Sequence, residues 1–312
     1  MKFSVTRFEK KNTGEWDQFV EGAKNGLFLF NRSYMDYHKE RFMDHSLMVH
    51  KGEKLMAVLP ANENGKKVCS HAGLTFGGLL YSNELKANET IQTINLILSY
   101  FRDLGFEELV YKAVPFIFCK YPSQEDLYAL FRHHAVLYRR DISSAVDINH
   151  PLRFSESKRQ AIDKGEKMGI LVVENNNFSE YWHLLQEVLK KFEVNPVHTL
   201  EEIGYLKKNF VDQIRLFEAR LDGELLAGVV VYDYGQVVHT QYMANSDKGR
   251  QSGALDMINN FLIKKEFSNR SYFSFGISTE EEGRELNEGL IQQKEMMGGR
   301  GVINDFYKIL LQ

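Results

Sequence analysis

The sequence predicts a mixed α/β protein made of two similar domains. One order of elements (helix, hairpin, strand, helix, strand, helix, strand) occurs twice along the 312 residues. In addition, both predicted hairpins carry glycine and glutamate followed by leucine, alanine and valine, in KGEKLMAVLP (51–60) and LDGELLAGVVVY (221–232). Such internal similarity indicates a duplicated folding unit. We therefore expect domains at residues 1–150 and 151–312, with the break near the turn residues at 147–154.

The first half supplies these elements in order. Alternating residues at 1–11 predict a strand, and GEWDQFVEGAKNG (14–26) has the apolar spacing of an amphipathic helix. After the hairpin at Lys51-Gly52 comes a strand with a glycine-rich exit, VCSHAGLTFGGLLY (68–81). The half is completed by a helix (90–105), a strand (108–116), a second helix (123–138) and a closing strand.

The second half repeats this order. SEYWHLLQEVLKKF (179–192) is the matching amphipathic helix, and the hairpin is centred on Asp222-Gly223. There follow a strand with a polar exit (237–254), a helix (253–267), a strand (271–277) and a last helix (280–297). We expect the acidic run 280–282 to form the charged first turn of that last helix.

Composition limits the possible functions. The 39 basic and 42 acidic residues give a net charge of −3 without long runs of one sign, so we expect no broad nucleic-acid-binding surface. Cys69 and Cys119 lack the spacing of metal or redox motifs and are expected to be free thiols, with no metal bound. The chain shows neither a signal peptide nor an apolar run long enough to span a membrane, which predicts a cytoplasmic protein.

One segment near the C-terminus carries a family resemblance. YFSFGISTEEEGRELNEGLIQQKEMMGG (272–299) is a strand, an acidic loop and a helix that ends on paired glycines. It resembles the corresponding segment of FemAB-type transferases, which are tandem GNAT-like acyltransferases, and the order of elements resembles theirs over nearly the whole chain. The matching positions are Gly289, Leu290, Lys294, Gly298 and Gly299. The resemblance implies two tandem GNAT-like domains, the first on the acceptor side and the second holding the acyl donor and the catalytic helix.

The same resemblance assigns a role to Lys294. In FemAB-like enzymes this lysine is thought to stabilise the negative charge that develops on the acyl carbonyl, a task worth several kcal/mol in a dry site. Gln293 and Met297 stand where the family usually has aromatic residues. These departures weaken the match at the donor pocket and leave the match at the lysine unchanged. The alternative is an exposed lysine that complements the helix dipole.

A second motif concerns the acyl donor. Acyl-CoA enzymes of the GNAT type bind pyrophosphate at the turn between a central strand and the next helix, where backbone N–H groups attract anions. The turn here is NSDKGRQSGA (245–254), and the candidate binding residues are Arg250, Gln251, Ser252, Gly253 and Ala254. Leu255 replaces the small residue that this motif expects. An ordinary serine-glycine helix entry is the alternative.

Candidates for proton transfer lie in the strand HTQYM. His239 is a candidate general base and Tyr242 a candidate proton donor. Regular alternation would place His239 and Tyr242 on opposite faces, so only one of them would face the site. Packed strand residues are the alternative for both.

Six residues are candidates for binding the acceptor. By resemblance, Lys39 is a basic residue near the acceptor cleft, Arg159 lies at a comparable domain junction, and His198 stands where such proteins hold a phosphate or carboxylate. His71 and Thr75 lie in a glycine-rich segment whose backbone can approach a ligand closely. Thr199, next to His198, is the sixth candidate. The alternative for Thr199 is a structural role, because Thr199 and Glu202 have the spacing of a helix capping box. Exposed surface charge is the alternative for Lys39 and Arg159.

These observations predict an acyltransferase that moves an acyl group, most simply acetyl, from acyl-CoA to an amine of a small or cell-envelope-related molecule. Aminoacyl transfer from tRNA to a peptidoglycan precursor is the alternative enzyme, and the negative net charge argues against it only weakly. A third possibility, from another class, is a duplicated GNAT-like fold that has lost catalysis and acts as a binding module.

Overall fold

The computed structural model describes residues 2–311, and their contacts divide the chain into two units. The first unit runs as far as Asp141 and also includes Glu281–Glu285 and the chain from Ile303 onward. The second comprises Ile142–Glu280 and Leu286–Val302. The first unit therefore ends nine residues before the expected boundary at 150. It also includes two segments from the second half of the sequence.

An exchange of closing strands explains this pattern. Strand β9 (Val136–Asp147) follows the first half of the sequence, yet its later residues pair with β14 (Tyr272–Ile277) in the second unit. Strand β17 (Arg300–Leu310) follows the second half, yet its later residues pair with β8 (Glu108–Lys112) in the first unit. Each half of the sequence thus completes the sheet of the other unit, so two sequential domains do not describe the contacts.

The first unit contains two sheets, with strand orders β1-β3-β4-β7 and β17-β8-β6-β5-β2. The other strands are β1 (Phe3–Arg7), β2 (Met43–Asp44), β3 (Leu47–Lys51), β4 (Lys54–Leu59), β5 (Asn62–Asn64), β6 (Lys67–Cys69) and β7 (Leu80–Tyr81). The helices are α1 (Thr13–Gly22), α2 (Arg32–Met35), α3 (Ala87–Asp103) and α4 (Glu125–Arg132). Short 3-10 turns are η1 (Lys10–Asn12), η2 (Phe28–Phe30), η3 (Asp36–His38) and η4 (Phe116–Phe118).

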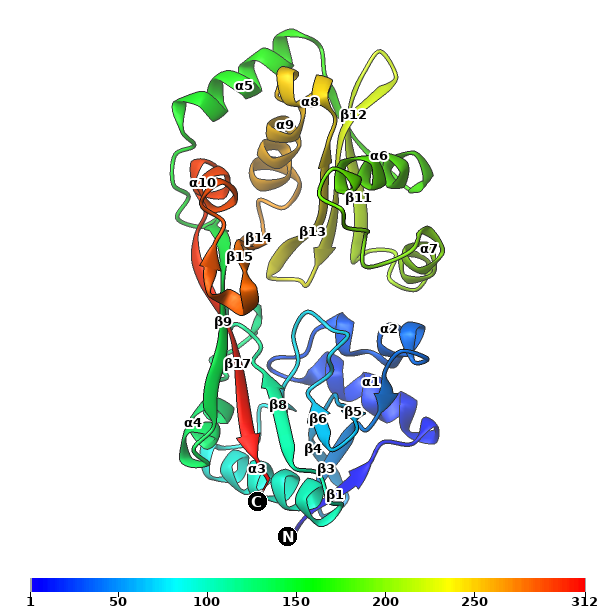
Figure 1. Cartoon of the computed structure of the whole chain (residues 1–312), viewed down its shortest axis with the longest axis vertical. Coiled ribbons are helices and arrows are strands. Elements are labelled where there is room, and N and C mark those ends of the chain that lie inside the picture. The colour runs from blue at the N-terminus through cyan, green and yellow to red at the C-terminus, as the bar shows by residue number, and fades with distance from the viewer. Residues whose placement is uncertain (1, 312) are drawn as a thin grey trace. The chain divides into compact units, whose positions relative to one another are not determined.

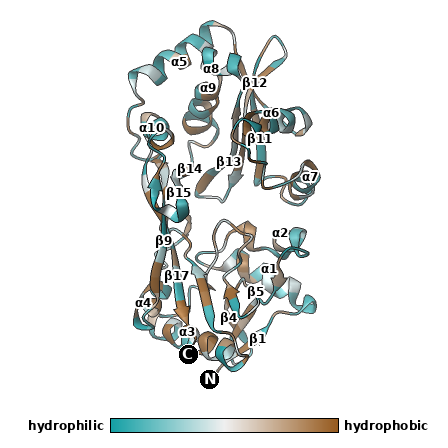
Figure 2. Ribbon diagram, viewed as in Figure 1, coloured by the Kyte–Doolittle hydropathy of each residue, from teal (hydrophilic) through white to brown (hydrophobic). Residues whose placement is uncertain are grey.

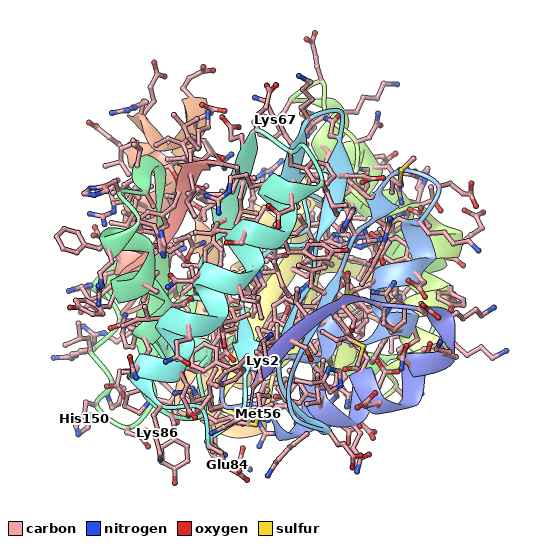
Figure 3. The ribbon with its side chains drawn as sticks, turned by 90° about the horizontal axis from the view of Figure 1, so that it is seen from below. Lys2, Met56, Lys67, Glu84, Lys86 and His150 are labelled. Atoms are coloured by element: carbon pink, nitrogen blue, oxygen red, sulfur yellow. The ribbon has the colours of Figure 1, made fainter. Side chains whose placement is uncertain are left out.

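Helix α3 organises the core of this unit. Its residues Ile94, Ile97 and Phe101 are buried against the β3–β4 hairpin and β8. Three- and four-residue spacing places these side chains on one face of the helix, as the sequence predicts. The helix runs from Lys86 at its start toward the end of β6 that carries Lys67, as seen in Figure 3. The predicted first hairpin is confirmed, with Gly52 at φ 65° in its turn.

The second unit is built on one sheet with the order β10-β11-β12-β13-β14-β9. Its strands also include β10 (Leu171–Asn175), β11 (Ile214–Leu221), β12 (Glu224–Asp233) and β13 (Val237–Asn245). Its helices are α5 (Glu156–Lys167), α6 (Ser179–Lys190), α7 (Leu200–Asn209), α8 (Asp247–Ser252), α9 (Ala254–Phe261), a π-helical turn η5 (Leu262–Glu266) and α10 (Glu288–Met296). A short ribbon, β15 (Thr279–Glu280) and β16 (Glu285–Leu286), joined by η6 (Glu281–Gly283), precedes α10.

Helix α9 covers one face of this sheet (Figure 1), where Ile258 of α9 and Leu262 of η5 pack with Val229 and Val231 of β12. Helix α6 packs on β12 and β13. In Figure 2 α9 is largely brown and α5 largely teal, which matches the polar sequence of α5. The second predicted hairpin is also confirmed, because Asp222 (φ 52°) and Gly223 (φ 85°) form its turn.

Two predicted helices are shorter than expected. The helix expected at 123–138 ends at Arg132, because His134 adopts φ 54° and Val136 already belongs to β9. The acidic run 280–282 is not the first turn of α10, so that expectation is wrong. Glu281 and Glu282 have positive φ angles, and the helix begins only after Asn287, whose side chain accepts a hydrogen bond from the Leu290 N–H at 3.0 Å.

Among residues 2–311, no helix combines the length and the apolar character needed to cross a bilayer. The same part of the chain contains no group of three or more His, Cys, Asp or Glu side chains placed to share a metal ion.

A buried carboxyl stabilises the start of α4. The Tyr111 hydroxyl donates to Asp126 Oδ2 at 2.5 Å and accepts from the Leu79 N–H at 2.7 Å. Burial raises the pKa of Asp126 to about 6, although the hydrogen bond from Tyr111 opposes that shift. The folded protein therefore retains this proton to a higher pH than the unfolded chain does.

The raised pKa predicts how Asp126→Asn changes stability with pH. The contribution of protonated Asp126 is fully present below pH 3.8 and is lost as pH rises to about 6. The free energy of unfolding of the wild type, relative to that of the Asn variant, should therefore fall by about 3 kcal/mol between pH 4 and pH 7. Urea unfolding of both proteins across this range tests it. A difference that does not change with pH would contradict the assignment.

Candidate active site

Strands β13 and β14 pair over only a short distance. They run parallel and match at three positions, from Val237 with Tyr272 to His239 with Ser274. Beyond this point each strand continues without the other (Figure 1). On its other side β13 pairs with β12, where Thr240 faces Val231 and Tyr242 faces Val230, so Gln241 is an extra residue that forms a β-bulge. The backbone of β13 from Thr240 onward is therefore open toward β14.

The bulge changes which side chains share a face. Tyr232 and Val230 lie two residues apart on β12 and therefore on one face, and their partners are His239 and Tyr242. His239 and Tyr242 consequently lie on the same face of β13. The expectation from regular alternation, that only one of them could face a common site, is wrong because the extra residue reverses the alternation between them.

Lys294 of α10 lies at the end of β14. Its ammonium group donates to the carbonyl oxygens of Gly276 at 2.9 Å and Ile277 at 2.6 Å, and to Ser278 Oγ at 2.8 Å. The residue is only 5% exposed. An exposed lysine that complements the helix dipole is therefore not what the structure shows. The side chain holds the end of β14 against α10 with all three of its donors.

Burial also changes the charge behaviour of this group. Loss of solvation lowers the pKa of Lys294 to about 8. Burial, assisted by the nearby Lys294 ammonium, lowers the pKa of His239 to about 4. His239 Nδ1 lies 3.1 Å from Ser274 Oγ on the neighbouring strand. Near neutral pH, His239 is thus an uncharged imidazole. Of these two residues, Lys294 has the pKa closer to neutral pH, so its protonation state changes in the range where enzymes commonly act.

Tyr242 and His198 form a second pair. His198 Nδ1 lies 2.6 Å from the Tyr242 hydroxyl, which also accepts from the His198 backbone N–H at 3.2 Å. The Trp182 ring of α6 packs edge-on against Tyr242 at 5.2 Å between centroids. Burial raises the pKa of Tyr242 to about 12. His198 is 4% exposed, so the structure places it inside this unit beside Tyr242. Thr199 caps α7 through the predicted capping box with Glu202.

The predicted donor-binding turn is not an open loop. Residues 247–252 form α8, and Gly253 ends it with φ 76° before α9 begins. Arg250 pairs with Asp247 within α8. Helix α5 covers the junction, because a Cβ on Gly253 would lie 2.3 Å from the carbonyl oxygen of Ala161, and Lys164 Nζ donates to the Gln251 carbonyl at 2.8 Å. Helix α5 thus occupies the space that the missing side chain of Gly253 leaves free.

Three acceptor-side candidates lie in the first unit. Lys39 is exposed directly after η3 and lines a surface cavity with Asn62 and Glu63. His71 is buried with φ 62°, and burial lowers its pKa to about 3, so it is uncharged at neutral pH. Thr75 is exposed. His71 packs against the rings of His38 and Phe42 within the same unit.

The glycines beside His71 serve packing of the chain on itself. A Cβ on Gly77 would lie 1.9 Å from the Ser70 carbonyl oxygen, and one on Gly78 would clash with Tyr111. Lys112, a residue that sequence reasoning missed, donates from Nζ to the carbonyl oxygens of Ala72 at 3.1 Å and Leu74 at 2.6 Å. Burial lowers the pKa of Lys112 to about 8. Like Lys294, it holds a loop by its carbonyl groups.

No described protein family and no curated protein sequence gives a significant match to this chain. Solved structures do match. FemX covers 97% of this chain and 96% of its own, with 10% identity and a TM-score of 0.68. The C-terminal domain of an Agrobacterium fabrum protein described as a lysylphosphatidylglycerol synthetase covers 97% of this chain and 92% of its own, with 13% identity and a TM-score of 0.63. A tandem GNAT protein from the clavulanic acid pathway covers 100% and 99%, with 10% identity and a TM-score of 0.55.

The fold is that of tandem GNAT-like proteins. This confirms the fold class and the resemblance predicted from the order of elements and the segment 272–299. Within this fold, the separated ends of β13 and β14, the bulge at Gln241 and the buried Lys294 gather around one place in the second unit. Ser274 and Ser278, which hold His239 and Lys294, were not found from the sequence because serine has no distinctive pattern.

The buried ammonium predicts a pH dependence of stability. The pKa of Lys294 is about 8 in the folded protein and near 10.5 when unfolded, so the folded state binds fewer protons between these values. Stability from this group should therefore rise by about 3 kcal/mol from pH 8 to pH 10.5. Denaturant unfolding of the wild type and Lys294→Met across this range measures the difference. Parallel pH curves for the two proteins would show that Lys294 is solvated.

Proposed function

We propose that this protein transfers an acyl group to an amine, with the reaction centre in the second unit where β13 and β14 separate. The observation that carries the proposal is Lys294, an ammonium group that is 5% exposed and fixed at the end of β14. Burying a cationic side chain costs free energy unless hydrogen-bond acceptors or anions surround it. Buried groups with shifted pKa values are concentrated at functional sites.

The geometry supports a defined division of roles. The amine attacks the acyl carbonyl carbon, a C–N bond forms, and the carbonyl oxygen becomes an oxyanion. Lys294 stabilises that charge once one of its N–H donors turns from Ser278 Oγ, the one side-chain acceptor of its three, to the substrate oxygen. Collapse of the intermediate expels the thiolate or alkoxide of the donor. The proton lost by the amine passes to solvent or to the leaving group, because His239 with a pKa near 4 is too weak a base to hold it.

Packing around α9 favours one class of donor. A CoA pyrophosphate at the start of α9 would have to displace α5, since Ala161 and Lys164 occupy the space beside Gly253 and Gln251. An aminoacyl ester carried on RNA requires no pyrophosphate at this turn. We therefore place the aminoacyl ester ahead of the acyl-CoA thioester that the sequence favours. Proteins of the same fold include a lysylphosphatidylglycerol synthetase, whose name denotes an aminoacylated product.

A donor comparison tests this choice. The purified protein is incubated with a panel of amines and either acetyl-CoA, longer acyl-CoAs or charged tRNA, and products are identified by mass spectrometry. Product formed with charged tRNA and not with acyl-CoA supports the aminoacyl ester. Product formed only with acyl-CoA would contradict the aminoacyl ester and assign acyl-CoA as the donor. The absence of product with every donor would favour a binding module.

Lys294→Met should lower the single-turnover rate by about a hundredfold or more, because a transition-state interaction is lost while most of the side-chain volume remains. Lys294→Arg should restore little, since a planar guanidinium cannot occupy the position of a compact ammonium. Rates are compared at a temperature where far-UV circular dichroism shows each variant folded. Lys190→Met, at the exposed end of α6, is the matched control and should react at the wild-type rate. A Met variant that reacts at the control rate would exclude Lys294 from catalysis.

A further inference from the structure

The second unit contains a surface cavity of about 570 Å³ at the start of α5, formed by the loop after β9, the first residues of α5 and the π-helical turn η5. We call it the α5 cavity. Its walls are held by backbone hydrogen bonds: the Ser155 N–H donates to the Met296 carbonyl at 2.8 Å, and the Ile148 N–H donates to the Ser271 carbonyl at 2.9 Å. A cavity of this volume suits a small molecule.

Three cations and no acids line the α5 cavity. Arg153 comes from the loop, Arg159 from α5 and Lys264 from η5. The chain as a whole has a net charge of −3, so this gathering of positive charge is local. Glu156 pairs with Arg159, whereas Arg153 and Lys264 have no carboxylate partner among residues 2–311. Arg153 and Lys264 are both exposed, so their charges are available to a ligand that enters the cavity.

Apart from the polar residue Ser268, the rest of the lining is apolar. Ile148, Phe154 and Ile263 contribute side chains to the wall, and Leu152 at the rim is 45% exposed. Lys264 Nζ lies 4.6 Å from the centre of the Phe154 ring, so this charge is held over an apolar surface. Inorganic phosphate alone would leave the exposed parts of Leu152 and Ile148 in contact with water, and a neutral apolar molecule would make no ion pair with the cations.

The π-helical turn brings Lys264 to this place. The Phe267 N–H donates to the Leu262 carbonyl at 2.9 Å, five residues earlier, and Phe267 remains in the core with 1% exposure. The turn therefore holds one residue more than an α-helical turn, and Lys264 and Lys265 are exposed between two buried ends. Such insertions are often found at functional sites. Lys264 lines the cavity, and its neighbour Lys265 does not.

We propose that the α5 cavity binds an amphiphilic anion, that is, a phosphate or carboxylate head on an alkyl or similar apolar group. The head pairs with Arg153 and Lys264, and the apolar group covers Ile148, Phe154 and Leu152. Such a molecule exists either free in solution or as a lipid in a membrane surface. The proposal does not depend on the transfer reaction, because Arg153 and Lys264 take no part in it.

Calorimetric titration with octyl phosphate, below its micelle concentration, tests the site. Octyl phosphate should bind the wild type, while inorganic phosphate and uncharged octyl glucoside should each bind at least about tenfold more weakly. Arg153→Gln and Lys264→Gln should each weaken octyl phosphate binding about tenfold, the usual effect of losing one charge-assisted hydrogen bond. Lys265→Gln removes the same charge from the same turn without touching the cavity and should bind as the wild type does.

The source of the ligand is separated by a second arm. Sedimentation with vesicles of phosphatidylcholine, with and without an anionic phospholipid, measures binding to a membrane surface. Binding of octyl phosphate without vesicle binding assigns a free amphiphile, and binding of both assigns a lipid. Vesicle binding without octyl phosphate binding, equal loss of affinity in the Lys265→Gln control, or unchanged affinity in both Arg153→Gln and Lys264→Gln would overturn the proposal. Melting temperatures of all variants establish that each is folded.

Discussion

The short parallel pairing of β13 with β14 is the constraint on which the candidate active site depends. After His239 and Ser274 the two strands no longer pair through their backbones, so their backbone groups beyond this point must be satisfied in another way. On β14 the solution is Lys294, which donates to the carbonyl oxygens of Gly276 and Ile277. On β13 the bulge at Gln241 turns Tyr242 to the same face as His239. The break in pairing accounts for the position of the buried cation, and the bulge between β12 and β13 accounts for the arrangement of the side chains beside it.

The burial of Lys294 links stability with chemistry. An ammonium group removed from water is stable only where acceptors replace the lost solvation, and three oxygens do so here. These oxygens replace the lost solvation only in part, so the pKa of Lys294 falls to about 8. The poorly solvated charge interacts more strongly with nearby groups than an exposed charge would. His239 is such a neighbour: burial is the main cause of its lowered pKa, and the Lys294 charge lowers that pKa further. Lys112 in the first unit serves the same structural purpose for the loop at 70–79.

The exchanged closing strands bear on how the chain folds. Residues 306–310 complete a sheet with β8, although nearly two hundred residues separate them in the sequence, and β9 leaves the first half to pair with β14. Neither half of the sequence contains all the strands of one unit. Contacts so distant in sequence form late and make the two halves depend on one another for their sheets.

The sequence by itself determined the order of the elements and both hairpins, because turn glycines and apolar spacing are local signals. The tandem GNAT-like fold was implied by the resemblance of residues 272–299 and of the element order to FemAB-type proteins. The same resemblance singled out Lys294 through its neighbours Gly289, Leu290, Gly298 and Gly299. Tertiary structure decided the rest. The bulge at Gln241 depends on how β12 pairs with β13, and the pairing of His198 with Tyr242 joins residues 44 positions apart. The burial of Lys294 and the partial burial of Lys112, like the covering of Gly253 by α5, follow from packing between distant segments, which no local pattern of residues records.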